Sequence, residues 1–347
     1  MKTVYLERMG PFLEAISQRM ELYVPQATDG HYTFEQFSSA DVSDLLLNPI
    51  RTYMSPKEFV FPLREIAAVF PTPIAPDDIE PFAVLGLKHC DLRALDILDK
   101  VFTEEAYEDP LYIARREQMF MISTDCTAPA DSCFCNVMRG QPYAQCGFDL
   151  NLSPVEGGFV VEVGSEKGQG LVDNIPQLFS DVPQSAIVQR ETNRSAAQAV
   201  LTEQNQHLHL DGSLSDMMEA GQDNEVFNEQ AETCVECQAC TRVCPTCHCF
   251  YLYDRKQEDY FNKLKMWDSC MRFSYARVAG GANPRTTLGD RLRHRLMHKF
   301  SYFAQRYGVD MCVGCGRCVD AEAGAVDIRV VLKRISDAYG NHKAAST

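Results

Sequence analysis

The sequence of 347 residues lacks the features of an exported or membrane-bound protein. No apolar stretch of roughly 18 residues or more is present, so no helix is expected to span a bilayer. The N-terminus has neither the layout of a signal peptide nor a twin-arginine leader. Fifteen cysteines in such a chain indicate metal ligation in a reducing compartment and argue against a disulfide scaffold. We therefore expect a cytoplasmic protein without a membrane partner.

Positive charge is scarce in the first two thirds of the chain. Residues 1–226 contain 15 Lys and Arg against 35 Asp and Glu, a balance of −20, whereas residues 227–347 contain 18 against 13, a balance of +5. Nucleic acid binding requires a basic footprint. The acidic balance of the larger part therefore argues against a nucleic acid partner.

Two kinds of functional motif are also missing. The glycine-containing segment 164–170 does not match G-x-G-x-x-G, so its spacing gives no case for a dinucleotide site. No nucleophile and base occur in a recognisable catalytic pattern, and we expect no catalytic residues of the chain's own.

What the sequence does contain is two cysteine-rich runs. The first has the spacing C-x2-C-x2-C-x3-C-P, which is typical of a [4Fe–4S] ferredoxin, and it comprises Cys234, Cys237, Cys240 and Cys244. The second comprises Cys312, Cys315 and Cys318. A structural zinc site would show paired C-x2-C knuckles instead. The two runs predict two iron–sulfur clusters and the transfer of single electrons, and the basic excess around them would offset the negative charge of the clusters.

The second run is incomplete, because Glu322 and Ala323 stand where the pattern calls for Cys-Pro. In two-cluster ferredoxins the fourth cysteine of each run ligates the other cluster. Cys244 is then expected to complete the cluster of the second run. The fourth ligand position of the first-run cluster is then expected to face Glu322. Three outcomes are open for that cluster: ligation by the carboxylate, a three-iron cluster, or rescue by another cysteine. The candidates for rescue are Cys247, Cys249 and Cys270.

The first part of the chain holds a further set of thiols, namely Cys90, Cys126, Cys133 and Cys135, with Cys146 further on. Cys90 begins a predicted helix directly after a predicted strand, a position at which the helix dipole stabilises a thiolate. The set is either the ligand set of a third [4Fe–4S] cluster or a scatter of buried thiols, and the sequence leaves both interpretations open.

The pattern of apolar residues predicts an α/β N-terminal domain, residues 1–226, followed by an α-helical dicluster ferredoxin domain, residues 227–347. Predicted strands cover 82–87, 119–123 and 158–163. A capping box at Thr287 begins a predicted helix over 288–307, on which Arg291, Arg295 and Lys299 form either a solvated face or a docking surface. A closing helix from residue 328 is expected to end at Gly340.

Several segments together resemble one protein family, the beta subunits of cytoplasmic sulfhydrogenases, to whose broader family the corresponding iron–sulfur subunit of anaerobic sulfite reductase belongs. The segments that carry the resemblance are Gly86-Leu-Lys-His-Cys90-Asp-Leu-Arg, Cys126 with Cys133-Phe-Cys135, Gly164-Ser-Glu-Lys-Gly168, Cys244-Pro-Thr-Cys247-His-Cys249, Trp267-Asp-Ser-Cys270 and Ala279-Gly-Gly-Ala-Asn-Pro-Arg285. Glu322-Ala323 departs from the Cys-Pro that ends the second run in this family. The resemblance spans the chain from about residue 80 onward.

The resemblance implies an iron–sulfur subunit that relays electrons between a flavin subunit oxidising NAD(P)H and a separate catalytic subunit. The Gly-Ser-Glu-Lys-Gly element favours a nickel–iron hydrogenase as that catalytic partner. The alternatives are a sirohaem sulfite reductase and a heterodisulfide-reductase-type complex. Two other classes of function stay open at this point: an iron–sulfur redox sensor and an autonomous enzyme.

Overall fold

The computed structural model describes residues 2–28, 30–38, 47, 49–71, 79–210 and 212–345. The chain forms two compact units. Unit 1 consists of Met1–Val60 and Ala75–Gln204, and unit 2 of Phe61–Ile74 and Asn205–Thr347. The domain boundary near residue 226 stays a prediction. It concerns independently folding domains, whereas the two compact units are defined by their internal contacts.

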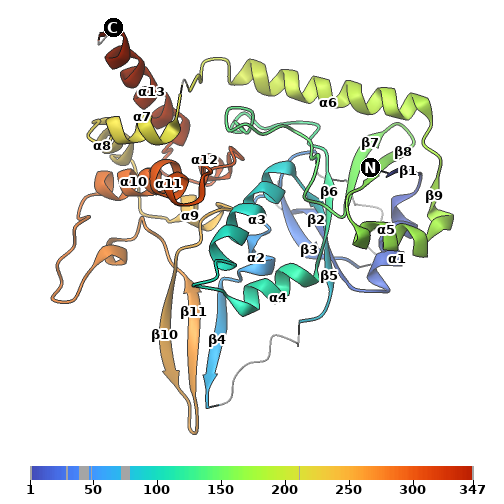
Figure 1. Ribbon diagram of the computed structural model, residues 1–347, viewed down its shortest axis with the longest axis horizontal. Coiled ribbons are helices and arrows are strands. Elements are labelled where there is room, and N and C mark those ends of the chain that lie inside the picture. Colours follow the sequence, from blue (N-terminus) through green and yellow to red (C-terminus); the bar gives the residue numbers. More distant parts are fainter. Residues whose placement is uncertain are drawn as a thin grey trace. The chain divides into compact units, whose positions relative to one another are not determined.

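Unit 1 is built on an eight-stranded mixed sheet in the order β3-β2-β5-β6-β7-β8-β1-β9 (Figure 1). The pairs β2–β5, β5–β6 and β6–β7 are parallel, and the other pairs are antiparallel. All six residues of β5 are buried, as expected for a central parallel strand. The strands are β1 (Lys2–Leu6), β2 (Glu21–Thr28), β3 (His31–Gln36), β5 (Phe82–Leu87), β6 (Met119–Thr124), β7 (Leu150–Val155), β8 (Gly158–Val163) and β9 (Phe179–Ser180).

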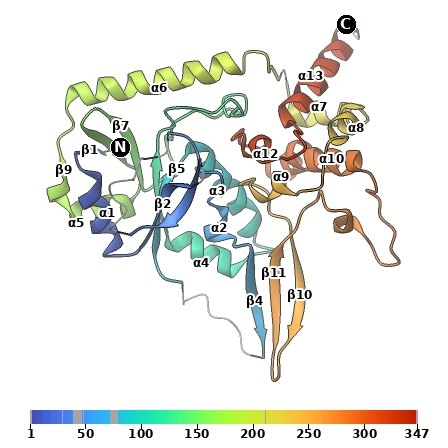
Figure 2. The same ribbon diagram turned by 180° about the vertical axis from the view of Figure 1, so that it is seen from behind.

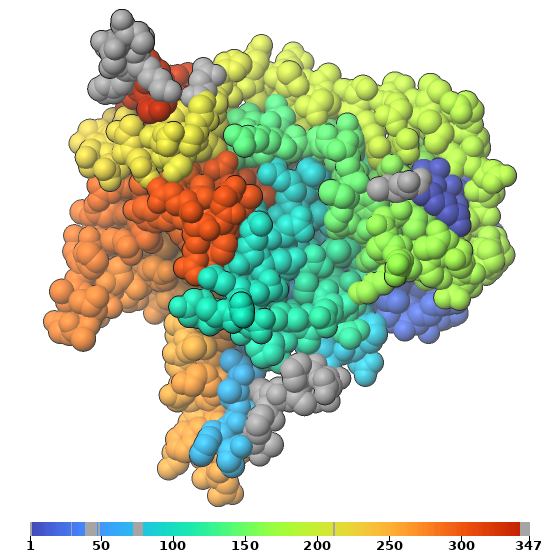
Figure 3. Space-filling view, viewed as in Figure 1, coloured from blue at the N-terminus to red at the C-terminus, as the bar shows by residue number. Residues whose placement is uncertain are grey.

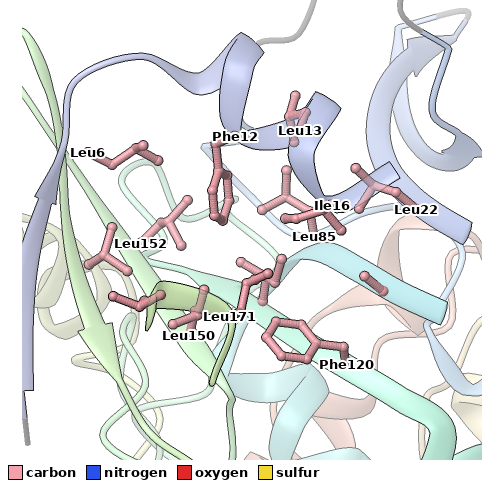
Figure 4. Packing of buried hydrophobic residues seen from close by; sticks show 14 of the residues in the cluster. Leu6, Phe12, Leu13, Ile16, Leu22, Leu85, Phe120, Leu150, Leu152 and Leu171 are labelled. Atoms are coloured by element: carbon pink, nitrogen blue, oxygen red, sulfur yellow. The ribbon is translucent and has the colours of Figure 1, made fainter. Parts of the chain in front are cut away.

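Helices α1 and α5 pack on this sheet and form its main apolar core. Phe12, Leu13 and Ile16 of α1 lie against sheet residues such as Leu85 and Leu150, all fully buried (Figure 4). Helix α6 is different, because few of its side chains are buried and the rest of the helix lies on the surface (Figure 3). The helices of unit 1 are α1 (Met9–Ser17), α2 (Lys57–Val60), α3 (His89–Phe102), α4 (Pro110–Gln118), α5 (Glu166–Asn174) and α6 (Gln184–Gln204).

Unit 2 combines helices with a three-stranded antiparallel sheet in the order β10-β11-β4 (Figure 2). Strand β4 (Arg64–Phe70) pairs with β11 (Phe261–Trp267), which also pairs with β10 (Phe250–Lys256). The helices are α7 (Leu214–Ala220), α8 (Val226–Ala231), α9 (Ala239–Arg242), α10 (Leu288–Met297), α11 (Phe303–Tyr307), α12 (Arg317–Asp320) and α13 (Ile328–Ala345). A π-helical turn, His298–Tyr302, joins α10 to α11. The expectation of an α-helical domain is therefore not confirmed.

Most local predictions agree with the structure. The three predicted strands correspond to β5, β6 and β8, and the mixed α/β character of the first part is confirmed. Thr287 caps α10 through a reciprocal capping box with Asp290, as predicted. The predicted end of the closing helix at Gly340 is wrong, because α13 continues through this residue to Ala345. No helix in the described part of the chain combines the length and the apolarity that crossing a membrane would require.

Candidate metal centres

The two cysteine runs follow the same backbone path. The second and fourth residues after the first cysteine of each run have left-handed backbone angles: φ is 55° at Glu236 and 64° at Gln238, and 67° at Gly314 and 75° at Gly316. A short helix follows each loop, α9 in the first run and α12 in the second. Glycine adopts this conformation freely, whereas other residues pay roughly 1–2 kcal/mol for it. The first run therefore forms its loop at a higher backbone cost.

This path directs a backbone N–H group at the first sulfur of each run. Cys234 accepts a hydrogen bond from the backbone of Glu236, and Cys312 accepts one from Gly314. Burial raises the pKa of both thiols, that of Cys312 to about 12, and these donors oppose the shift. Hydrogen bonds to sulfur stabilise its negative charge when a metal has displaced the proton. The loops thus suit thiolates that bind iron.

Cys244 lies among the thiols of the second run, although it ends the first. Burial is the main cause that raises the pKa of Cys318, and the neighbouring Cys244 and Cys315 raise it further. Cys244 is also among the groups that raise the pKa of Cys312. These neighbours are the cysteines that the prediction of crossed ligation places on one cluster.

Glu322 lies with the remaining three thiols of the first run. Burial raises the pKa of Cys240 to about 12, Arg295 opposes this shift, and Cys318, Cys234 and Cys237 add to it in that order. Glu322 is 9% exposed, and its Oε1 lies 3.9 Å from the Cys237 sulfur. Its Oε2 accepts a hydrogen bond of 2.8 Å from the backbone of Val326, which holds the carboxylate in place.

A pocket opens beside this second group of donors. Two cysteines of the first run line it together with one of the second, Glu322, a buried arginine and apolar side chains. The lining residues are Cys234, Cys240, Met271, Leu292, Arg295, Cys318, Glu322, Val326 and Ile328. Among the residues that the structure describes, the lining includes none of the three cysteines considered for rescue.

The rescue candidates instead lie near one another. Cys247 is within hydrogen-bonding reach of Cys244, and Cys270 is within reach of Cys249. The Tyr275 hydroxyl donates to the Cys249 sulfur at 3.7 Å. The geometry thus favours Glu322 over these thiols as the neighbour of the first run.

Two cations contact the cysteine runs, Arg295 of α10 and Lys299 of the π-helical turn that follows it. Arg295 donates from Nη2 to the backbone oxygen of Cys240 at 3.1 Å. The Lys299 ammonium lies 3.4 Å from the Cys244 sulfur and donates to Thr246 Oγ1 at 3.1 Å. These two side chains and that of Arg291 are each at most 3% exposed. Both predictions for this basic row, a solvated face and a docking surface, are therefore wrong.

In unit 1 two of the thiols, Cys126 and Cys90, lie near the buried Lys88, which precedes α3. Its ammonium donates to Thr124 Oγ1 at 2.7 Å and to the Asp125 carbonyl at 3.0 Å. Burial lowers the pKa of Lys88, while Cys126 and Cys90 are among the groups that raise it. Burial raises the pKa of Cys126 to about 11, and Cys133 adds to this shift.

The rest of the set lies close by. Cys133 packs with Cys135 against Leu201 of α6. Cys146 differs from the others because it is exposed. The structure thus brings the four N-terminal candidates into one neighbourhood and leaves the fifth cysteine at the surface.

The donor sets suit iron–sulfur clusters. Within the described ranges, no group of three or more His, Cys, Asp or Glu side chains is placed to hold a single metal ion. The spacing of the cysteines, the N–H donors and the buried cations all suit a cluster.

Sequence reasoning missed the buried cations Lys88, Arg295, Lys299 and Arg317. A partial signal was available for two of them. Arg295 and Lys299 occur three residues after Leu292 and Leu296, so they border the apolar row of their helix. Charged residues at the edge of an apolar row are normally assigned to the surface, and the pattern alone did not predict their burial.

Two comparisons with known proteins bear on these sites. Residues 233–326, which include both cysteine runs, match the family model of a 4Fe-4S dicluster domain. Subunit beta of sulfhydrogenase 2 from Pyrococcus furiosus is 32% identical over 319 residues, which cover 91% of this chain and 92% of the relative. The match to the dicluster domain confirms the prediction that the chain is an iron–sulfur protein.

Proposed function

The chain belongs to the family of sulfhydrogenase beta subunits, and we propose that it relays single electrons between a flavin subunit that oxidises NAD(P)H and a catalytic subunit of the hydrogenase type. As a member of this family it is an iron–sulfur electron-transfer subunit, and the name of its relative implies a complex with other subunits. Two observations support the proposal: Cys244 neighbours Cys318 and Cys312 of the second run, and Glu322 lies 3.9 Å from the Cys237 sulfur of the first.

We assign one cluster to Cys244, Cys312, Cys315 and Cys318, and the other to Cys234, Cys237, Cys240 and Glu322. When bound, a [4Fe–4S] cluster supplies a carrier that accepts and releases one electron at a time. The chain's own residues hold and insulate it: the loop N–H groups face the sulfurs, and buried side chains limit the access of water. The four N-terminal thiols, Cys90, Cys126, Cys133 and Cys135, are the proposed ligands of a third cluster.

The partners are tested by anaerobic purification of the native complex through a tag on this chain. We expect a flavin subunit and a nickel–iron large subunit to co-purify. A sirohaem protein in place of the nickel–iron subunit would assign the chain to a sulfite reductase. A heterodisulfide-reductase-type subunit in that place would assign it to that class of complex. The absence of a flavin subunit would contradict the relay. NAD(P)H oxidation by the purified chain alone would establish an autonomous enzyme instead.

The third cluster is tested by changing Cys133 and Cys135 together to serine. If the assignment is right, the iron content should fall from about twelve to about eight irons per chain, and the signals of the two ferredoxin-type clusters should be retained. Cys146→Ser is the matched control, because this thiol is exposed and is expected to bind no iron. An unchanged iron content in the double variant would return the N-terminal set to buried thiols without a metal.

A further inference from the structure

Arg295 and Lys299 occupy equivalent positions on successive turns of one helical segment, and each makes a hydrogen bond to a cysteine of a different group of donors. Arg295 donates to the backbone of Cys240 and lines the pocket beside Glu322. Lys299 contacts the sulfur of Cys244. One helix therefore presents a buried cation to each of the two groups of donors.

These charges are costly to bury unless a negative group compensates them. Arg295 is 3% exposed and Lys299 is 2% exposed. In the part of the chain that the structure describes, neither forms a salt bridge with a carboxylate. The main neighbours of opposite charge are cysteine sulfurs: those of Cys240, Cys318, Cys247 and Cys244 for Arg295, in order of decreasing effect, and those of Cys244, Cys247 and Cys312 for Lys299. Arg295 also has a buried Nε without a hydrogen-bond partner. The missing negative charge is what iron-bound thiolates would supply.

We propose that Arg295 and Lys299 raise the reduction potentials of the two clusters to different extents, Arg295 more for the cluster of Cys234, Cys237 and Cys240 and Lys299 more for the cluster completed by Cys244. The inference rests on the cluster assignment of the proposed function. Both residues are positioning residues that act through the ligands. Each reduction adds one electron to a cluster and breaks no bond, and the electron comes from the partner that donates to the relay. A fixed positive charge beside the cluster stabilises its reduced form, which carries one more negative charge.

The test is a redox titration, followed by paramagnetic resonance, of the intact protein with Lys299→Met or Arg295→Met. Lys299→Met should lower the potential of the Cys244 cluster by about 59 mV or more, a tenfold change in the ratio of reduced to oxidised cluster for one electron. The other cluster should move less. Arg295→Met should give the opposite pattern. Glu322→Cys, which alters one donor of the first-run cluster, identifies which signal belongs to it.

Two kinds of control separate charge from shape. Lys299→Arg and Arg295→Lys keep the charge, so each potential should stay within roughly 28 mV of its wild-type value. That limit corresponds to about a threefold change in the ratio of reduced to oxidised cluster. Arg293→Met removes a cation from the same helix, but this residue is 41% exposed and pairs with Asp290, so neither potential should move. Intact clusters with unchanged potentials, or equal shifts of both clusters in each neutral variant, would overturn the inference while leaving the relay in place. Absence of both clusters from the wild-type protein would overturn the cluster assignment itself.

A measurement on the wild-type chain covers the case in which the neutral variants fail to fold or to bind iron. Protein labelled with nitrogen-15 only at lysine should show a weak hyperfine coupling in the signal of the Cys244 cluster, from the ammonium of Lys299. Labelling only at arginine should show a coupling in the signal of the first-run cluster. Absence of the lysine coupling, or equal lysine coupling to both clusters, would overturn the inference that the two cations act unequally on the two clusters.

Discussion

The two cysteine runs share one backbone path but differ in the residues that form it. The second run has glycine at both left-handed positions, and Cys315 is 8% exposed. The first run has Glu236 and Gln238 at those positions, Cys237 is exposed, and a carboxylate takes the place of the fourth sulfur. The spacing of ligands alone therefore does not make two sites equivalent. The first run combines backbone strain, solvent access and a harder donor as its proposed fourth ligand, and each difference can be tested by itself.

The largest expected effect concerns Glu322. A carboxylate is a harder ligand than a thiolate and should hold its iron less firmly. Mild oxidation should therefore remove about one iron per chain and give a three-iron signal from the first run, while the second run stays intact. Glu322→Cys should abolish the three-iron signal and remove the difference between the runs. Paramagnetic resonance of the oxidised protein is the measurement.

Two outcomes would count against this role of Glu322. If the oxidised wild-type protein shows only four-iron clusters, a cysteine is the fourth ligand, and serine substitution of Cys247, Cys249 and Cys270 in turn would identify it. If Glu322→Ala leaves the iron content and the potential unchanged, the carboxylate does not bind the metal.

The next effect concerns the backbone of the loops and should have opposite signs in the two runs. Gly316→Ala forces a side chain into the left-handed region and should destabilise the second run by roughly 1–2 kcal/mol. Gln238→Gly at the equivalent position should stabilise the first run by up to about 1 kcal/mol, because the relief of strain exceeds the extra entropy of the unfolded chain. The denaturant midpoint for loss of cluster absorbance, measured anaerobically, reports both changes. Equal shifts of the same sign would show that the left-handed angles do not distinguish the runs.

A smaller effect concerns the cap of α10 at Thr287, and it should change the stability of both runs equally. Thr287 Oγ1 accepts a hydrogen bond of 3.1 Å from the backbone of Asp290 and caps the helix that carries both Arg295 and Lys299. Thr287→Ala should cost about 1 kcal/mol. Because the cap supports one helix that serves both sites, the denaturant midpoints for the two clusters should fall together. A change confined to one cluster would contradict this shared support.

The smallest effect concerns the ion pair between Glu236 and Arg291, whose nitrogen and oxygen lie 2.6 Å apart. Glu236 is 43% exposed, so solvent screens the pair, and Glu236→Gln should destabilise the first run by less than about 1 kcal/mol. The loss should shrink further in high salt, because the remaining attraction is electrostatic. A salt-independent effect in the same denaturant assay would assign the change to packing instead.

Features that depend on residues close together in the sequence could be predicted from it. The cysteine spacing, the strand Phe82–Leu87 and the capping box at Thr287 are local patterns, and the structure contains each corresponding element. The three-stranded sheet was not predicted, because β4 lies about 190 residues before its partner β11 and such pairing leaves no local signal. Burial of Arg295 and Lys299 was missed for a related reason. Their compensating sulfurs come from distant segments, so the helix alone gives no reason to bury a charge.

The position of Cys244 among the second-run thiols has a consequence for the connectivity of the chain. If one cluster binds Cys244 and Cys312, it acts as an inorganic cross-link that closes the intervening 67 residues into a ring. Clips that close long loops restrict the unfolded chain strongly. The ring contains Gly280 and Gly281, both with a φ of 85°. A single cut there would leave both ends of the ring tied to the same metal group, so the pieces would separate only after the iron is removed.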